Sequence, residues 1–399
     1  MSDRLSLAIV CHARLGGSGV IAADIAVGLA RRGHRVRVIA TARPARTLPG
    51  HENLIFEQVS TSNYPLFDHP PYTLDVAAKI VEVARAHELD LVHLHYAIPH
   101  AASALLARQT LGDRAPRFVT TLHGTDVTVV GGDPGYREVT RMTVVAADAV
   151  TAPSEFLRRE AVRLLALPPE VDVEVIPNFV DTGAFAPPQR RDRRRLGELL
   201  AMDGAAPAGP FLFHVSNFRP VKRTPELMDI LARVRDRVPA QLVVVGDGPE
   251  RESAERRAAE LGLCRHVTFL GERTDFAELL GHADAFVLPS ESESFGVAAL
   301  EALSCGVPVF GYRVGGLPEV VADGCGTLVE PFDVDALAGA IVAMLGDDAG
   351  RERARRAARA RAVDCFERER LLDRYESLYR RLTVGRPAAP RRGAGGGPV

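Results

Sequence analysis

The sequence has few cysteines for its 399 residues, and they form no recognisable pattern. There is no CxxC pair and the count is odd, with the five thiols at Cys11, Cys264, Cys305, Cys325 and Cys365. This usage argues against a disulfide framework or a structural zinc site, and it favours reduced thiols in the cytoplasm. We therefore expect each cysteine to be a small buried side chain.

The sequence also has no long apolar run and no excess of one charge. Its first apolar stretch, Leu5–Cys11, is too short to span a bilayer, and no small-residue cleavage site follows it, so a buried strand is predicted there. With 49 Lys and Arg against 51 Asp and Glu, the formal net charge is −2. No overall field attracts nucleic acid or a membrane surface, and any anion site must be local.

What the sequence does contain is an alternation of short β-rich runs and amphipathic helical segments, in each half of the chain. Nearly continuous apolar strands are typical of parallel sheets that helices cover on both faces. The predicted strands of the first half are Leu5–Cys11, Arg35–Ala40, Leu91–His95, Phe118–Leu122, Ala149–Ala152 and Val173–Ile176. Those of the second half are Phe211–Ser216, Gln241–Val245, Val267–Leu270, Ala285–Leu288, Val307–Phe310 and Thr327–Val329.

The fold class predicted is therefore α/β, with two Rossmann-like, doubly wound parallel-sheet domains that face a central cleft. The length also favours two domains. Clusters of Pro, Gly and Arg place the linker between them, and the tail has almost no apolar content. The predicted units are 1–185 (N-terminal domain), 186–209 (linker), 210–365 (C-terminal domain), 366–384 (a helix that packs back toward the N-terminal domain) and 385–399 (a disordered tail).

A glycine-rich turn, Arg14–Gly19, joins the first predicted strand to a helix. Glycines allow close approach of a ligand, and the helix N-terminus favours an anion. The spacing is not GxGxxG, and Thr41 and Arg43 stand where a dinucleotide-binding protein has an acidic residue. A nicotinamide-dependent dehydrogenase is therefore disfavoured.

A cationic segment, Ser216–Arg223, follows the first strand of the second half. Arg219 and Lys222 would stand at the carboxyl end of a strand, where open α/β sheets bind ligands. Fixed cations there could stabilise a departing diphosphate without a metal. A solvated turn is the alternative, and it suits Arg223 better than the other two.

The segment Ser290–Ala302 contains an apolar helical stretch and two glutamates, Glu293 and Glu301. Glu293 follows a strand and Glu301 lies inside the helix, where a buried carboxylate needs partners. Sugar hydroxyls would satisfy it, but for Glu301 a structural ion pair with an arginine is an equally good interpretation. A further strand–glycine–helix junction, Arg313–Glu319, suggests a second phosphate-facing helix terminus.

Polar residues gather at the predicted strand ends of the first half. They are His93, His95, Tyr96, His100, Thr120, Thr121, His123, Gly124, Thr125 and Asp126. So many histidines raise the question of a metal, but no carboxylate-rich ligand set accompanies them. Hydrogen-bonding and core roles are therefore predicted, and no metal site.

Taken together, these motifs resemble those of the retaining GT-B glycosyltransferases. Glu293 and Glu301 have the E-x7-E spacing of that family, and Val314–Glu319 matches its G-G-x-P-E element. The resemblance extends from the first strand to about residue 382.

Within the family, the motifs of this chain resemble more narrowly those of the N-acetylglucosaminyl-L-malate synthases of bacillithiol biosynthesis. The segments that carry this likeness are Gly16–Val20, Asn63–Tyr64, His69–Tyr72, His93–His100, Thr120–Asp126, Asn178–Phe179 and Ser216–Arg223. Many family members have an arginine where Asn217 stands, whereas here the arginine is Arg219.

The resemblance implies a GT-B fold and transfer of N-acetylglucosamine from UDP-N-acetylglucosamine to L-malate with retention, the first step of bacillithiol biosynthesis. It implies no cofactor and no metal, and it suggests a homodimer. The N-terminal domain would carry the acceptor and the C-terminal domain the UDP-sugar.

The resemblance also assigns roles to single residues. Arg219, Lys222, Glu293 and His123 would be the catalytic set, with the two cations on the diphosphate, Glu293 on sugar hydroxyls and His123 on the donor sugar. Glu301 would bind the ribose, and the other predicted donor-site residues are Gly16, Gly17, Ser216, Asn217, Ser294, Phe295, Gly296 and Gly316. The predicted acceptor site is Ser18, Asn63, Tyr96, Thr121 and Arg141.

Three other functions remain open from the sequence. A related transferase could use inositol phosphate or another acceptor. An epimerase acting on UDP-N-acetylglucosamine would have the same architecture and donor. A regulatory protein could bind a nucleotide sugar without catalysing any reaction. The presence of both the donor-site and the acceptor-site residues argues against this third function.

Overall fold

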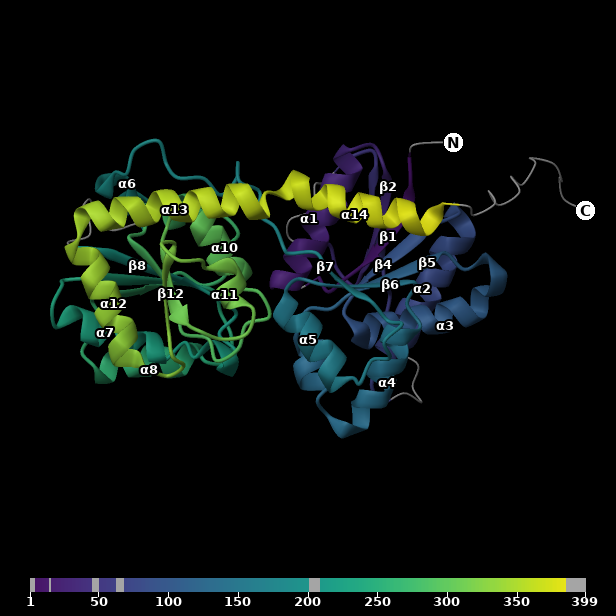
Figure 1. Ribbon diagram of the computed structural model, residues 1–399, viewed down its shortest axis with the longest axis horizontal. Helices are drawn as coiled ribbons and strands as arrows, with labels where there is room; N and C mark the ends of the chain where they lie inside the picture. The colour runs from purple at the N-terminus through teal and green to yellow at the C-terminus, as the bar shows by residue number, and fades with distance from the viewer. Residues whose placement is uncertain (1–3, 14–15, 45–49, 62–67, 201–208, 385–399) are drawn as a thin grey trace, which may run out of the picture.

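In the computed structural model, residues 4–13, 16–44, 50–61, 68–200 and 209–384 are described, and they form two parallel β-sheets, each flanked by helices (Figure 1). The first sheet has the strand order β3-β2-β1-β4-β5-β6-β7. Its strands are β1 (Ser6–Val10), β2 (Arg35–Ala40), β3 (Leu54–Gln58), β4 (Leu91–His95), β5 (Arg117–Thr121), β6 (Ala149–Ala152) and β7 (Val173–Val175).

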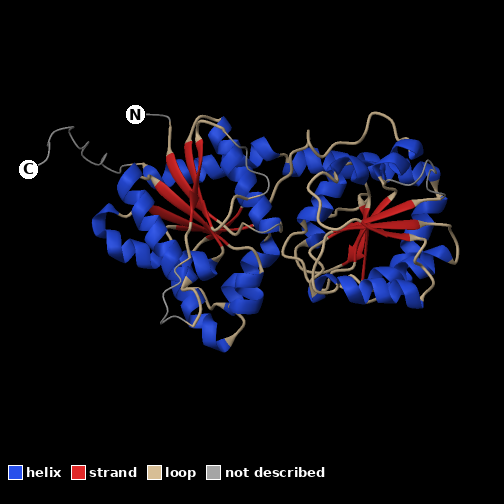
Figure 2. Ribbon diagram, turned by 180° about the vertical axis from the view of Figure 1, so that it is seen from behind, coloured by secondary structure: helices blue, strands red, loops and turns tan. Residues whose placement is uncertain are grey.

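The second sheet repeats this doubly wound plan with the order β10-β9-β8-β11-β12-β13. Its strands are β8 (Phe211–Val215), β9 (Gln241–Val245), β10 (Val267–Phe269), β11 (Ala285–Leu288), β12 (Val309–Tyr312) and β13 (Gly326–Val329). Figure 2 shows both sheets as central layers between helices. Buried apolar clusters pack on both faces of each sheet, because the strands are apolar on both sides.

The helices follow the strands in the order that βαβ units require. Those of the first domain are α1 (Gly17–Arg31), α2 (Tyr72–His87), α3 (Ala102–Leu111), α4 (Pro134–Val145) and α5 (Glu155–Leu164). Those that follow are α6 (Arg193–Leu199), α7 (Glu226–Arg235), α8 (Arg251–Glu260), α9 (Ala277–His282), α10 (Val297–Ser304), α11 (Leu317–Val320) and α12 (Val334–Gly346). No helix in the described part of the chain is long and apolar enough to cross a membrane.

The last two helices connect the domains. In Figure 1, α13 (Asp348–Phe366) lies along the second domain and α14 (Arg368–Thr383) continues over the first. Between them, Val180 N donates to Phe366 O at 3.0 Å and Arg368 N donates to Val180 O at 3.1 Å. The two chain segments that pass between the domains are thus hydrogen-bonded side by side. Leu372 and Tyr375 of α14 join the apolar cluster formed by α1 and the first sheet.

The fold-class prediction is confirmed, since both halves form Rossmann-like parallel sheets. The sequence reading missed β3, a short outer strand that ends in Glu57 and Gln58 and has no buried residue. In the predicted linker, α6 occupies part of 186–209. The predicted disordered tail, 385–399, lies outside the described residues.

Candidate active site

A cavity of about 700 Å³ lies between the carboxyl ends of the two sheets. His12, Tyr96 and His123, which follow β1, β4 and β5, line it from the first domain. Ser216 and Asp247, which follow β8 and β9, line it from the second. Strand ends meet here because both sheets are parallel, which is the usual place for a ligand in open α/β folds.

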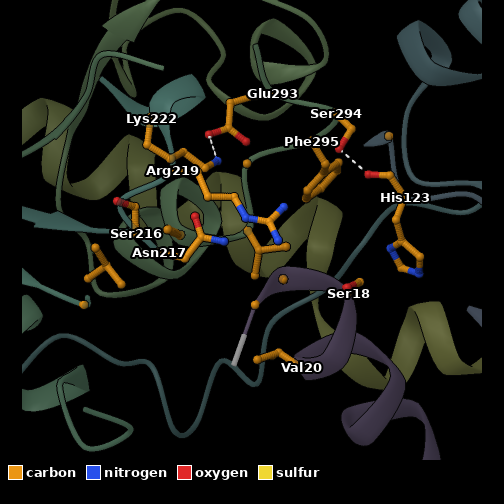
Figure 3. A pocket seen from close by; sticks show the side chains of 18 of the residues that line it. Ser18, Val20, His123, Ser216, Asn217, Arg219, Lys222, Glu293, Ser294 and Phe295 are labelled. Carbon is orange, nitrogen blue, oxygen red and sulfur yellow. Dashed lines mark hydrogen bonds and ion pairs between the residues drawn. The ribbon is translucent and has the colours of Figure 1, made fainter. Parts of the chain in front are cut away.

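On the second-domain wall, Lys222 and Glu293 form an ion pair with 2.6 Å between Nζ and Oε1 (Figure 3). Ser290 Oγ donates to the same carboxylate oxygen at 2.8 Å. Glu293 is almost fully buried, so these two donors offset the cost of removing its charge from water. The sequence placed both residues in the donor site, and the structure brings them together on the cavity wall.

Arg219 lies on the same wall but has a different environment. Its side chain is exposed, and no side chain or carbonyl among the described residues forms a hydrogen bond or ion pair with it. Figure 3 shows its guanidinium extending across the cavity toward the first domain. A guanidinium without a protein partner in a cleft is available for a bidentate anion such as phosphate.

The N-terminus of α1 faces these cations from the first domain. Gly16 and Gly17 line the cavity, and the first turn of this fifteen-residue helix has no acidic residue. Its unpaired N–H groups and positive dipole end favour an anion. Gly17 also lies close to the second domain, because a Cβ there would be 3.4 Å from Val297 Cγ2.

Glu301 lies on α10, with 5% of its surface exposed, and it lines the cavity. Ser294, Phe295 and Gly296, which precede this helix, also line it. Gly296 has a φ of +97°, a conformation that favours glycine where the chain turns from the Glu293 loop into the helix. Asn217 lies on the same wall, beside Ser216.

The glycine pair of the G-G-x-P-E element passes against the backbone of Glu293. Gly315 has a φ of +55°, and a Cβ there would be 2.0 Å from Glu293 O. Gly316 N donates to the same carbonyl oxygen at 2.8 Å. Gly316 is not among the described lining residues of the cavity, and its N–H is already used. This arrangement therefore does not support the predicted contact of Gly316 with the diphosphate, because the N–H instead positions Glu293.

Glu319, the last residue of that element, binds the other domain. Its carboxylate accepts hydrogen bonds from Glu155 N at 2.8 Å and Phe156 N at 2.7 Å, the first two residues of α5. Nearby, Ser154 Oγ donates to Ser294 O at 2.6 Å. A carboxylate at a helix N-terminus is favourable for the dipole and satisfies two free donors. Here the cap also joins the two domains beside the cavity.

Replacing Glu319 with alanine should weaken substrate binding as well as stability. We expect a loss of about 1–2 kcal/mol in the free energy of unfolding, typical of a lost cap, and a several-fold higher KM for the donor. The matched control is Asp333→Ala, because Asp333 caps α12 through Ala336 N at 2.8 Å within the second domain. Thermal unfolding and steady-state kinetics test this. An equal change of KM in both variants would contradict an interdomain role for Glu319.

His123 follows β5, and side chains from both domains hold its backbone in place. Asp126 Oδ1 accepts from His123 N at 3.1 Å and from Gly124 N at 2.9 Å, which fixes the turn. The second domain contacts the same turn, because Ser294 Oγ donates to His123 O at 2.6 Å (Figure 3). The ring of His123 packs against Tyr96, with 4.9 Å between ring centroids.

The histidines at these strand ends are buried and neutral. Burial lowers the pKa of His93, His100 and His123 to about 3, and it lowers the pKa of His95 well below its ordinary value. They hydrogen-bond with other side chains and backbone groups, as in the 2.6 Å contact of His93 Nε2 with Thr121 Oγ1. Among the described residues, no group of three His, Cys, Asp or Glu side chains is arranged to hold a metal.

The predicted acceptor residues lie in different places. Ser18 and Tyr96 line the cavity, and hydrogen bonds to Ser18 and Thr125 partly oppose the burial that raises the pKa of Tyr96. Asn63 lies outside the described residues. Thr121 is fully buried behind the wall, bonded to Thr151 Oγ1 at 2.6 Å, because its side chain faces the packed interior of the sheet.

Arg141 is also away from the cavity. It lies on α4, where Nε donates to Ala166 O at 3.2 Å. In this arrangement neither Thr121 nor Arg141 lines the cavity, and a contact of either with an acceptor stays a prediction that the geometry does not support.

The sequence analysis missed several wall residues, among them His12, Asp247 and Arg273. His12 and Asp247 come just after β1 and β9, and Arg273 lies a few residues beyond β10. The rule that ligands bind at the carboxyl ends of parallel strands would have found them. Arg273 is paired with Asp275 at 2.8 and 2.9 Å, so its charge is partly used.

Comparison with known families agrees with this architecture. Residues 15–184 match the family model described as Glycosyltransferase Family 4, and residues 203–361 match that described as Glycosyl transferases group 1. The Anabaena protein HepE, solved in complex with UDP and glucose, superimposes with a TM-score of 0.77 at 23% identity, covering 94% of this chain and 99% of that one.

Two named relatives are similar over most of their length. The N-acetyl-alpha-D-glucosaminyl L-malate synthase of Bacillus anthracis is 38% identical, over 94% of this chain and 97% of the relative. The D-inositol 3-phosphate glycosyltransferase of Mycobacterium tuberculosis strain F11 is 32% identical, over 96% and 82%. With both family models matched in order and two Rossmann-like domains enclosing the cavity, the chain belongs to the GT-B glycosyltransferases, in the group that includes the N-acetylglucosaminyl-L-malate synthases.

Proposed function

We propose that this glycosyltransferase moves N-acetylglucosamine from UDP-N-acetylglucosamine to the hydroxyl of L-malate, with retention, as the first step of bacillithiol biosynthesis. The observation that carries the chemistry is the guanidinium of Arg219, which has no ion-pair partner among the described residues and faces the α1 N-terminus beside the Lys222–Glu293 pair. This wall concentrates positive charge where a diphosphate would leave. The donor and acceptor come from the likeness to the Bacillus anthracis synthase.

The proposed donor position follows from the charges on the wall. The diphosphate would lie between Arg219 and the first turn of α1, with Gly16 and Gly17 in contact. Lys222 would contact it while still paired with Glu293, whose second carboxylate oxygen is available to accept from a sugar hydroxyl. Glu301, buried on α10, would bind the ribose hydroxyls.

In the proposed reaction, the bond between the anomeric carbon and the diphosphate oxygen breaks, and a bond to the malate hydroxyl oxygen forms on the same face. The malate hydroxyl gives its proton to the departing phosphate oxygen, so the products are the glycoside and UDP. Fixed cations stabilise the negative charge that develops on UDP. No protein nucleophile is assigned, and we propose that no metal or cofactor takes part.

A cytoplasmic location is predicted from the scattered cysteines. A homodimer is predicted from the resemblance. On α4, Tyr136, Val139 and Met142 are exposed at helical spacing, so their replacement by polar residues offers a first test by light scattering.

The second candidate is a transferase that uses an inositol phosphate acceptor. The Mycobacterium tuberculosis relative, named as a D-inositol 3-phosphate glycosyltransferase, supports it. The two acceptors are both anionic and both present a secondary hydroxyl, so a direct comparison of the two substrates is needed to separate them.

UDP release from the purified protein tests both candidates. The reaction contains UDP-N-acetylglucosamine and EDTA, with L-malate, inositol phosphate or no acceptor. We expect release only with malate, and a product mass equal to the sugar joined to malate. Release with inositol phosphate alone would select the second candidate, and release without acceptor would indicate hydrolysis or epimerisation. Loss of activity in EDTA that Mg²⁺ restores would contradict metal independence.

A further inference from the structure

His95 lies directly behind the cavity residue His123 and has no role in the reaction proposed above. His95 is the last residue of β4 and is paired in register with Thr121 of β5. Because His123 is two residues beyond Thr121, His95 and His123 lie on the same face of the sheet. His95 Nδ1 is 2.8 Å from His123 Nε2, and the two rings stack with 5.1 Å between centroids. His95 has no exposed surface.

Only one of the two rings can donate in this contact. Both are neutral because burial disfavours the imidazolium. A neutral imidazole has one N–H and one lone pair in the ring plane. Either His95 donates from Nδ1 to His123 Nε2, or His123 donates from Nε2 to His95 Nδ1.

The other nitrogen of His95 decides between these arrangements. Nε2 of His95 is buried and has no hydrogen-bond partner within the part of the chain that the structure describes. The neighbouring His93 cannot supply one, because Tyr379 OH and Thr121 Oγ1 already occupy its nitrogens at 2.7 and 2.6 Å. A proton on Nε2 would be a buried N–H without an acceptor, which is rarer in proteins than an unsatisfied buried acceptor. The proton therefore belongs on Nδ1 of His95.

We infer that His95 donates Nδ1–H to Nε2 of His123 and so holds His123 in the tautomer that carries its proton on Nδ1. Nδ1 is the ring nitrogen of His123 that remains for a ligand in the cavity. His123 then enters the site as a hydrogen-bond donor, and its partner must be a lone pair, such as a sugar hydroxyl oxygen. His95 is a positioning residue, and His123 cannot accept a proton at Nδ1 in this state.

The identity of that ligand rests on the proposed function, but the tautomer does not. The full-length protein, labelled with ¹⁵N-histidine and free of ligand, gives distinct shifts for protonated and unprotonated ring nitrogens. His123→Asn assigns the signals by their loss. We expect Nδ1 of His123 to be protonated and Nε2 unprotonated. The opposite pattern would overturn the inference whether or not the protein turns over any sugar nucleotide.

Two substitutions at His95 test the positioning itself. His95→Leu removes the donor, whereas His95→Asn can present an amide N–H near the place of Nδ1. We expect the leucine variant to mix the tautomers of His123 and to lower kcat/KM for UDP-N-acetylglucosamine about five- to tenfold, as for one lost hydrogen bond. The asparagine variant should recover most of the wild-type tautomer population of His123 and most of the wild-type kcat/KM.

A merely structural His95 would behave differently. Both variants would then lose stability in thermal unfolding, while the ¹⁵N pattern of His123 stayed that of the wild type, and this result would overturn the positioning role. If the leucine variant does not fold, the wild-type and asparagine spectra still decide the tautomer. Absence of turnover in the wild type would contradict the proposed function and leave the tautomer measurement intact.

Discussion

Replacing Arg219 with alanine should lower the turnover of the proposed reaction by about a hundredfold or more, while the protein remains as stable as the wild type. The size follows from the loss of one fixed group that stabilises charge on the leaving diphosphate. Stability should not change because Arg219 is exposed and its guanidinium binds no protein group among the described residues. UDP release at saturating donor and acceptor measures the first effect, and thermal unfolding the second.

The matched control is Arg237→Ala, which removes one positive charge from an exposed position after α7, outside the cavity. It should leave turnover within about twofold of the wild type, because a distant exposed charge is screened by salt. If Arg219→Ala kept near-normal turnover, the assignment of this guanidinium to the diphosphate would be wrong.

Lys222→Ala is expected to be as damaging to turnover, but it also affects stability. Lys222 is the ion-pair partner of Glu293, whose side chain is 9% exposed. Its removal leaves a buried carboxylate with Ser290 as its recorded donor, which is destabilising. The pair Lys222→Ala and Lys222→Ala/Glu293→Gln separates the two effects: the second change should restore stability and not turnover.

The fold was accessible from the sequence because its signals are local. Continuous apolar runs such as Gln241–Val245 and Ala285–Leu288 became β9 and β11 with the predicted bounds. Local patterns failed where burial was weak, as in β3, whose side chains are partly exposed or exposed. The predicted strand Val307–Phe310 is shifted to Val309–Tyr312, where Gly311 and Tyr312 continue the pairing with Leu328 and Val329 of β13.

Site residues could be predicted from the sequence only where they belong to a recognisable motif. Glu293, Lys222 and Arg219 lie on one wall as predicted from their places after strands. By contrast, nothing near Glu319 indicates that its carboxylate caps a helix more than 160 residues away in the chain. Likewise, the direction in which Thr121 points depends on the packing of β5 against its neighbours, which local spacing does not specify.

The second large effect expected is acid instability. Burial lowers the pKa of His93, His100 and His123 to about 3, that of His214 to about 4, and that of His95 well below its ordinary value. In the unfolded chain each would titrate near 6.5. Below that pH the unfolded state binds more protons than the native state, so unfolding is favoured as the pH falls.

The size of this loss of stability depends on how many histidines have a lowered pKa in the native state. Each contributes about 1 kcal/mol of lost stability between pH 6.5 and 5.5, and about 1.4 kcal/mol for every unit below, until its native pKa is reached. Five together amount to about 5 kcal/mol over the first unit, which is comparable with the whole stability of many proteins. We expect the urea midpoint, followed by circular dichroism, to fall sharply between pH 7.5 and 5.5.

One substitution and its control connect this loss to the buried rings. His214→Asn should reduce the loss between pH 6.5 and 5.5 by about 1 kcal/mol, because His214 is fully buried between Val287 O and Ser216 Oγ, each at 2.8 Å. His87→Asn, at an exposed position, should leave the loss unchanged. A urea midpoint that does not depend on pH across this range would mean that the rings can be protonated in the native state. The inference about the tautomer of His123 would then lose one of its premises, because it starts from a neutral ring.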